Sequence, residues 1–307
     1  MKKFLLKFIV FAFIGLVMIF ILILLPPTPK VSESLLFIDE RKDSLLIYVD
    51  SPRILFVGGS NLSFGLNSQT IKDSLHLNPI NTAVDAAIGL KYMMENTGQY
   101  IKKGDIVVLI PEYHYFFTDY NNASEELTRT IFDVNINKIK LLSIDQLLLN
   151  FPYLCKLASS KCIPAEYTHV EKSDVYSVHS FNQYGDVYPA YRENRMHFLP
   201  YEKITDSFKS EVIQGIRDFE RNIYAKEGIL LISYPALQDS SYINLEESIK
   251  RVENEYRKNG FTILGTPQKY MMPDSLFFNT PYHLNNKGVA VRTKLLIEDI
   301  SKFLNNR

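Results

Sequence analysis

One serine and one histidine in this chain stand in surroundings that suit nucleophilic chemistry. Ser60 follows an apolar run, in the stretch ILFVGGSNLSF, and it is presented by two glycines. In open α/β sheets, ligands lie outside the carboxyl ends of the strands, where this serine would stand. His283 lies in FFNTPYHLNNKG, just before the last predicted helix. A serine needs a nearby base to become a nucleophile, and histidine is the usual one. Ser60 and His283 are therefore our candidate pair.

Other interpretations of these two residues remain open from the sequence. Gly-Gly-Ser-Asn is also ordinary turn chemistry, which needs no catalytic role. His283 could instead cap the last helix or bond to the linker near the N-terminus. The pairing depends on whether the fold brings the two loops together, since both would open on the same edge of a doubly wound sheet.

Polar and aromatic residues also follow the predicted third strand. Glu112 could bind a lysine, a sugar hydroxyl or His283, or simply bond to the chain that follows it. Tyr113 begins the cluster YHYFF, whose rings could stack on a sugar or an acyl chain, or form local core. The remaining histidines considered show no metal-ligand spacing, and we expect no metal: His114, His169, His179 and His197.

The bulk composition limits the classes of partner. Lys plus Arg equal Asp plus Glu at 34 each, which argues against nucleic acid because phosphate binding needs a basic excess. The chain is long enough for one large domain or two modest ones. No cofactor is expected. Cys155 and Cys162 lack zinc-ligand spacing, and either a disulfide or two free buried thiols would fit them.

The N-terminus predicts a membrane anchor. Three lysines, at positions 2, 3 and 7, precede the uncharged apolar run Phe8 to Leu25. This run is long enough to span a bilayer, and the lysines favour a cytoplasmic N-terminus. A cleaved signal peptide is the alternative, but the run exceeds a usual signal core and Pro-Pro-Thr-Pro lacks a small-x-small cleavage site. We therefore expect a single-pass protein of the cytoplasmic (inner) membrane, with residues 1–26 as tip and anchor and the remainder extracytoplasmic or periplasmic.

The rest of the chain predicts a linker and one α/β domain. Residues 27–52 have the composition of a linker, with a short extended piece at 45–49. Residues 53–307 alternate strands and helices, which predicts a three-layer α/β/α sandwich around a five-stranded parallel sheet. The expected strands are 54–57, 79–82, 105–110, 229–233 and 261–264. The expected helices are 69–75, 90–102, 208–225, 245–258 and 287–304.

A long departure from this alternation covers residues 113–203. It contains an apolar helical stretch at 139–149, both cysteines and a tyrosine-rich section from 167 to 201. Insertions of this length are usually functional or form subdomains. We expect a cap over the carboxyl edge of the sheet; a lobe that faces the membrane or a partner is the alternative.

The blocks around Ser60 and His283 resemble the first and last motifs of the SGNH/GDSL hydrolase family, over about residues 53–304. The resemblance implies a flavodoxin-like fold and the hydrolysis or transfer of esters, often acyl groups on carbohydrates. More narrowly, the chain resembles the anchored extracytoplasmic branch that includes proteins for D-alanylation of teichoic acid and acetylation of exopolysaccharide. It implies Ser60 as nucleophile and His283 as base.

The resemblance also implies an oxyanion site, and it departs from the family pattern at two points. Gly89 matches the second-block glycine, whose backbone N–H would stabilise an oxyanion together with that of Ser60. Gly59 and Asn61, beside the serine, are expected at the same substrate site.

Glu112 stands where the family has an asparagine donor, and Thr280 stands where it has the aspartate that orients the histidine. Asn279 could orient the imidazole instead, as asparagine does in cysteine proteases.

These observations predict a membrane-anchored SGNH-like esterase or O-acyltransferase that acts on acyl esters of a cell-envelope glycan. The expected partners are the membrane and an acylated glycan or small ester. The alternative is a catalytically silent protein of the same fold that binds glycan or assists a membrane-bound acyltransferase.

Overall fold

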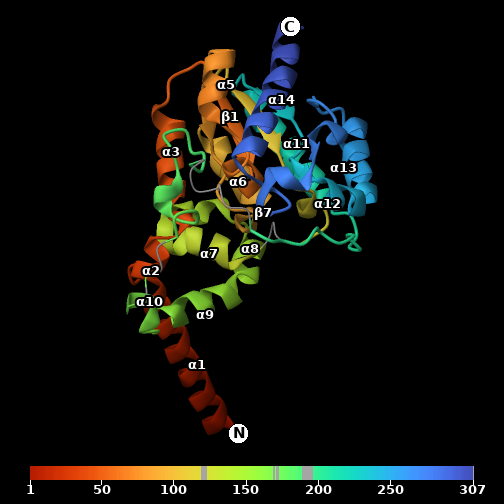
Figure 1. The fold of residues 1–307 in the computed structure, drawn as a ribbon. Coiled ribbons are helices and arrows are strands. Elements are labelled where there is room, and N and C mark those ends of the chain that lie inside the picture. Colours follow the sequence, from red (N-terminus) through yellow and green to blue (C-terminus); the bar gives the residue numbers. More distant parts are fainter. Residues whose placement is uncertain (119–122, 169, 171–172, 189–195, 307) are drawn as a thin grey trace.

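A four-stranded parallel sheet forms the centre of the molecule (Figure 1). The structure is a computed structural model, and it describes residues 1–306 except 119–122, 169, 171–172 and 189–195. The strand order is β2-β1-β3-β4, and every neighbouring pair is parallel. The strands are β1 (Arg53–Gly58), β2 (Asn78–Asn81), β3 (Ile106–Ile110) and β4 (Ile229–Ile232). The predicted α/β class with a parallel sheet is therefore confirmed, with one strand fewer.

The fifth predicted strand is reduced to a single bridge. Ile263 pairs with Ile232 of β4 in parallel orientation, and two backbone hydrogen bonds support the contact. Glycines with positive φ angles, Gly260 and Gly265, stand on both sides of the segment and limit any strand to the four residues between them. The expectation of a full strand at 261–264 was wrong, although the segment lies where that strand would be.

Helices cover both faces of the sheet, because alternate residues of each strand point to opposite sides. Leu55, Val107 and Leu230 belong to one core, and their neighbours Phe56, Val108 and Leu231 belong to another. The first core is covered by α3 (Ile38–Tyr48), α6 (Leu90–Gln99), α11 (Ser210–Ala225) and α13 (Glu246–Lys258), and the second by α5 (Ser68–Leu75) and α14 (Asn286–Asn305). This is a three-layer arrangement.

The region predicted as a linker is folded helix. It forms α2 (Pro29–Ser32), a short 3-10 turn (Leu35–Phe37) and α3, with Ile38 and Leu46 buried. The sequence suggested a linker because α3 is rich in charged residues. Two of those charges are buried and paired, since Asp39 and Asp43 both meet Lys138 of the insertion. The expected extended piece at 45–49 is the end of this helix.

A buried ion pair joins the sheet to the helices at the edge opposite the carboxyl ends of the strands. The Arg53 guanidinium donates to both carboxylate oxygens of Asp105, at 2.8 and 2.5 Å, and both side chains are fully buried. Its remaining donors bond the carbonyls of Leu46 and Tyr100. One side chain therefore fixes the start of β1, the end of α3 and the end of α6.

The insertion is mostly short helices. They are a 3-10 turn (Tyr113–Phe116), α7 (Glu125–Arg129), a π-helical turn (Thr130–Val134), a 3-10 segment (Ile136–Leu141), α8 (Ile144–Leu149), α9 (Phe151–Ser160), α10 (Ala165–Thr168) and a 3-10 turn (Val178–Ser180). The apolar stretch at 139–149 is divided where Ser143 and Gln146 form a capping box that starts α8. Part of the predicted tyrosine-rich section, and His169, lie outside the described residues.

Of the two states expected for the cysteines, the disulfide is not formed: both are free thiols, and neither is buried. Cys155 lies in α9, and Cys162 follows the helix end. The helix from Cys155 to Ser160 carries the chain roughly 7.5 Å along its axis before Cys162, and a disulfide needs Cα atoms within about 7 Å. This helical separation disfavours the bond.

The N-terminal helix α1 (Lys2–Ile23) projects from the rest of the molecule (Figure 1). It is long and apolar enough to cross a membrane, and none of its residues is buried. Both a membrane anchor and a signal sequence have these properties.

Candidate active site

Two loops at the carboxyl edge of the sheet build the site. The chain leaves β1 through Gly58 and Gly59, and Ser60 begins the short helix α4 (Ser60–Ser63). A side chain on Gly58 would meet the Ile110 carbonyl of β3 at 2.5 Å, and one on Gly59 would meet a Glu112 oxygen at 2.7 Å. Both glycines are thus required for space, and they let the serine loop pack directly against the end of β3.

His283 comes from a small hairpin between the sheet and the last helix. Strand β7 (Phe277–Thr280) pairs antiparallel with β8 (His283–Leu284). Thr280 holds the turn, since its hydroxyl accepts hydrogen bonds from the backbone N–H groups of Tyr282 and His283. Those contacts involve the backbone, not the imidazole. Thr280 therefore shapes the hairpin and takes no part in orienting the ring nitrogens.

The hairpin brings His283 to Ser60 across 223 positions of sequence. The distance from Ser60 Oγ to His283 Nε2 is 2.8 Å. On the opposite side of the ring, Asn279 Oδ1 lies 2.9 Å from Nδ1. An amide oxygen can only accept, so Nδ1 carries the proton and Nε2 presents a lone pair to the serine hydroxyl. This is the tautomer that a general base requires.

Two aromatic residues hold the imidazole in this orientation. The ring of Phe64 stacks on that of His283 with centroids 4.2 Å apart and planes 11° apart. The Tyr176 hydroxyl lies 3.3 Å from His283 Nδ1 and accepts a hydrogen bond of 2.5 Å from Asn279 Nδ2. Tyr176 thereby contacts both the imidazole and the Asn279 amide that faces it. His283 itself is buried.

Sequence reasoning missed both aromatic residues. Phe64 ends the ILFVGGSNLSF stretch, four residues after the serine, and this spacing on a helical turn was the available signal. Tyr176 lies in the insertion, 107 positions before His283. Nothing in its local sequence distinguishes it from the other tyrosines nearby.

A buried carboxyl group lies against the candidate nucleophile. Glu112, just beyond β3, places Oε1 3.5 Å from Ser60 Oγ. The same oxygen accepts from the backbone N–H and the side-chain amide of Asn61, at 3.1 and 3.2 Å. Burial raises the pKa of Glu112 to about 7, and the Asn61 hydrogen bonds oppose that rise. Glu112 is thus poised between a neutral and a charged state near neutral pH.

The side-chain amide nitrogen of Asn61 is hydrogen-bonded, whereas its side-chain oxygen is not. Its amide nitrogen donates to the Ile110 carbonyl as well as to Glu112, while its Oδ1 is buried without a hydrogen-bond partner. Asn61 is only 3% exposed. It links the serine loop to the end of β3 and sets the position of the Glu112 carboxyl.

Gly89 and Tyr113, both considered as binding residues, have structural contacts instead. The Gly89 N–H, which the family resemblance assigned to an oxyanion, donates to the Ala86 carbonyl at 3.1 Å and closes a helical turn before α6. Its φ of 90° is the conformation that requires glycine there. Tyr113 is 1% exposed and packs in the core, so of its two interpretations the structure shows local core and not a ligand-facing ring. Its backbone N–H donates to the Tyr282 hydroxyl.

A cavity of about 310 Å³ opens beside the serine loop. Its walls carry two acidic side chains, Asp85 and Glu112, and the aromatic side chains of His114, Tyr115 and Tyr201. The Tyr115 hydroxyl donates to the Ala86 carbonyl at 2.8 Å, and the rings of His114 and Tyr201 meet edge to face at 4.6 Å. The aromatic cluster was thus expected in the correct region, but the residues that line the cavity are its second and third members.

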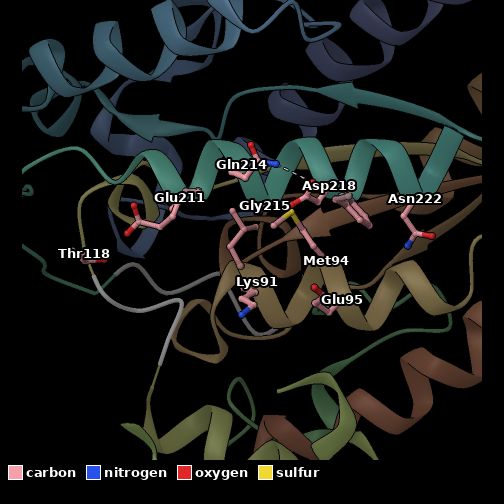
Figure 2. A pocket seen from close by; sticks show the side chains of 12 residues that line it. Lys91, Met94, Glu95, Thr118, Glu211, Gln214, Gly215, Asp218 and Asn222 are labelled. Carbon is pink, nitrogen blue, oxygen red and sulfur yellow. Dashed lines mark hydrogen bonds between the residues drawn. The ribbon is translucent and has the colours of Figure 1, made fainter. Parts of the chain in front are cut away.

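A larger cavity, of about 600 Å³, lies between α6 and α11 (Figure 2). Lys91 and Met94 line it from α6, with Met94 reaching toward α11, and Glu211 and Gln214 lie on the α11 side. Neither Ser60 nor His283 lines either of the two cavities. We place the candidate site at the smaller cavity, because Glu112 there contacts the serine.

No known family model matches the chain, and no curated protein is significantly similar to it in sequence. Within the described residues, no three His, Cys, Asp or Glu side chains are grouped as metal ligands. The functional assignment therefore rests on the geometry of this site.

Proposed function

We propose that this chain is a membrane-anchored, extracytoplasmic SGNH-like esterase or O-acyltransferase that acts on acyl esters of a cell-envelope glycan. The observation that carries the proposal is the continuous row Ser60, His283, Asn279, with hydrogen-bond distances of 2.8 and 2.9 Å. A nucleophile, a base in the correct tautomer and a group that orients the base are the three parts of a serine hydrolase site.

The first half of the proposed reaction acylates the serine. His283 Nε2 takes the proton of Ser60 while Oγ attacks the carbonyl carbon of the ester, and the carbonyl electron pair moves to oxygen. When the tetrahedral intermediate collapses, the bond to the alcohol breaks, and His283 gives its proton to the departing oxygen. In the second half, the hydroxyl of water or of a glycan attacks the acyl group by the same route in reverse. The identity of that hydroxyl decides between esterase and transferase.

Asn279 acts in this mechanism through the histidine. It fixes the tautomer, but as a neutral group it stabilises the imidazolium less than an aspartate would. We therefore expect slow turnover compared with enzymes that carry a full triad.

Glu112 sets the electrostatic condition for the reaction. An oxyanion forming on a substrate bound to Ser60 develops near the donors that now converge on Glu112 Oε1. An ionised Glu112 would repel that oxyanion, whereas a neutral carboxylic acid would donate a hydrogen bond to it. The neutral form, which burial favours, is the active form in our proposal.

Covalent labelling of Ser60 tests the proposal directly. The full-length chain in detergent is treated with a fluorophosphonate probe, and a panel of short acyl esters is assayed in parallel. We expect labelling and turnover, and we expect both to be lost in Ser60→Ala. The matched control is Ser240→Ala, which removes an exposed hydroxyl on α12 (Asp239–Asn244) and should behave as wild type. Absence of both labelling and turnover in the wild-type chain would exclude hydrolytic chemistry.

A second function is favoured by one observation: the Glu112 carboxyl, 3.5 Å from Ser60 Oγ, already accepts the hydrogen bonds of the Asn61 backbone and side-chain amides. A site closed in this way suits a catalytically silent protein that binds a glycan or assists a membrane-bound acyltransferase. Under that proposal, Ser60→Ala retains glycan binding and the cellular phenotype of the wild type. Loss of the phenotype in Ser60→Ala, with folding intact, would instead support the enzyme.

A further inference from the structure

The end of α1 is fastened to the insertion. Lys161, directly after α9, donates from Nζ to the carbonyls of Leu25 and Pro26, at 3.3 and 2.9 Å. The same ammonium pairs with Asp133 at 2.5 Å, and both of these side chains are fully buried. Nearby, the Thr28 hydroxyl donates to Glu166 of α10 at 3.1 Å. These bonds hold α9 at the level where the apolar run of α1 ends.

Helix α9 lies across the end of α1 and packs against it (Figure 1). If α1 crosses the bilayer, the 18 apolar residues from Phe8 to Leu25 span about 27 Å, which places Leu25 at the outer boundary of the hydrocarbon. The ten residues of α9 extend about 15 Å from that point. The whole of α9 is therefore held near the surface of the membrane, with α7 packed against it.

The far end of α9 and the adjoining helix α8 expose large apolar side chains. We call this group the juxtamembrane patch, and it comprises four residues with high exposed fractions: Ile144 (76%), Leu148 (68%), Leu149 (53%) and Phe151 (46%). In contrast, Gln146 and Asn150 of the same segment are buried. The segment thus turns its polar amides inward and its apolar side chains outward, the reverse of a surface helix in water.

We propose that the juxtamembrane patch inserts into the lipid headgroup region of the same membrane that α1 crosses. The inference rests on α1 being a retained anchor, as in the proposed function. Lipid is the expected occupant because the patch lies at the far end of α9, and α9 packs against α1, an apolar helix without a buried residue. The exposed Asp145 beside it limits the depth to the interface. The insertion then fixes the α/β domain on the membrane at a second point.

Depth-dependent quenching of a fluorophore tests the proposal. The full chain, with Cys155→Ser and Cys162→Ser, carries a single cysteine at Leu148 or Phe151 that is labelled with an environment-sensitive dye. It is reconstituted in vesicles of phosphatidylethanolamine and phosphatidylglycerol that contain nitroxide lipids. We expect at least about twofold stronger quenching than at Ile243, an apolar control on α12 that is 69% exposed. A nitroxide near the ester linkage should quench more than one near the chain end.

A further label at Phe11 in α1 separates the possible failures. Quenching at Phe11 with values at Leu148 and Phe151 equal to those at Ile243 would overturn the proposal but keep the anchor. A blue-shifted emission at the patch without lipid quenching would mean that protein covers it, which also overturns the proposal. No quenching at Phe11 would remove the anchor itself, and with it the membrane location in the proposed function. Thermal unfolding of each labelled chain verifies that it is folded.

Discussion

One carboxyl oxygen of Glu112 lies against the serine loop: Glu112 Oε1 is 3.5 Å from the Ser60 hydroxyl oxygen and 3.1 Å from the backbone nitrogen of the next residue, Asn61. A carboxyl group in this place makes the site sensitive to pH, because the donors around the nucleophile face an anion or a neutral acid according to protonation. Burial raises the pKa of Glu112 to about 7, so the change falls near neutrality.

The first prediction concerns the pH dependence of ester turnover. As the pH rises above about 7, wild-type kcat/KM should fall, because ionised Glu112 repels the developing oxyanion. Glu112→Gln replaces the acid with a permanent donor and should keep its activity above pH 8, on the order of 10- to 100-fold above wild type there. The measurement is kcat/KM for a short acyl ester between about pH 5 and 9.

Glu126→Gln is the matched control for this profile. Partial burial also raises the pKa of Glu126, but the closest hydrogen-bonding partners of Ser60 are Glu112 and His283. Its profile should follow that of wild type. If kcat/KM fell equally above pH 7 in wild type and in Glu112→Gln, ionisation of Glu112 would not be the cause of the fall.

The second prediction concerns stability. The pKa of Glu112 rises from its ordinary 4.5 to about 7 in the folded chain, so between these values the folded state holds a proton that the unfolded state has lost. The free energy of unfolding must therefore decrease as pH rises across this window, by about 3 kcal/mol in total. The difference between the thermal unfolding midpoints of wild type and Glu112→Gln should therefore decrease as the pH rises from about 5 to 8. A constant difference would contradict the shift.

The third prediction concerns the Arg53–Asp105 pair. Arg53→Met leaves the Asp105 carboxylate buried without its partner and should destabilise the fold by about 3–5 kcal/mol. Adding Asp105→Leu removes the orphaned charge and should recover part of the loss. The exposed pair Lys103–Glu227, with N–O distance 2.7 Å, is the control, and Lys103→Met should cost less than about 1 kcal/mol. Thermal or denaturant unfolding measures all three variants.

Local pattern was sufficient to predict the four paired strands and helices such as α11, because continuous apolar runs such as 106–110 and the 3.6-residue period of α11 depend only on nearby residues. It failed for α3, where Asp39 and Asp43 made the segment look solvated. Their partner Lys138 lies 99 positions from Asp39, and the ion pairs that bury these charges cannot be seen in the local sequence.

The candidate site shows the same division. The glycine turn and the histidine loop marked Ser60 and His283, since each carries its own local signal. Tyr176 could not be found, because its role comes from one hydroxyl delivered by the insertion. Tyr113 and Tyr115 could not be told apart either, since which ring faces the cavity depends on how the chain turns after β3. The placement of Asn279 beside Nδ1 requires the β7–β8 hairpin.

The last prediction concerns that asparagine. Asn279→Ala removes the acceptor on His283 Nδ1, so the ring is free to adopt the wrong tautomer, and kcat should fall by about 10²- to 10⁴-fold with little change in KM. Asn279→Asp keeps the acceptor, adds a charge that stabilises the imidazolium, and can accept from the Tyr176 hydroxyl. It should raise kcat severalfold and move the acid limb of the pH profile upward, because the carboxylate raises the pKa of the histidine. Tyr176→Phe keeps the ring and should produce only a small loss. If Asn279→Ala retained wild-type kcat, the histidine would be oriented by Phe64 and the hairpin alone.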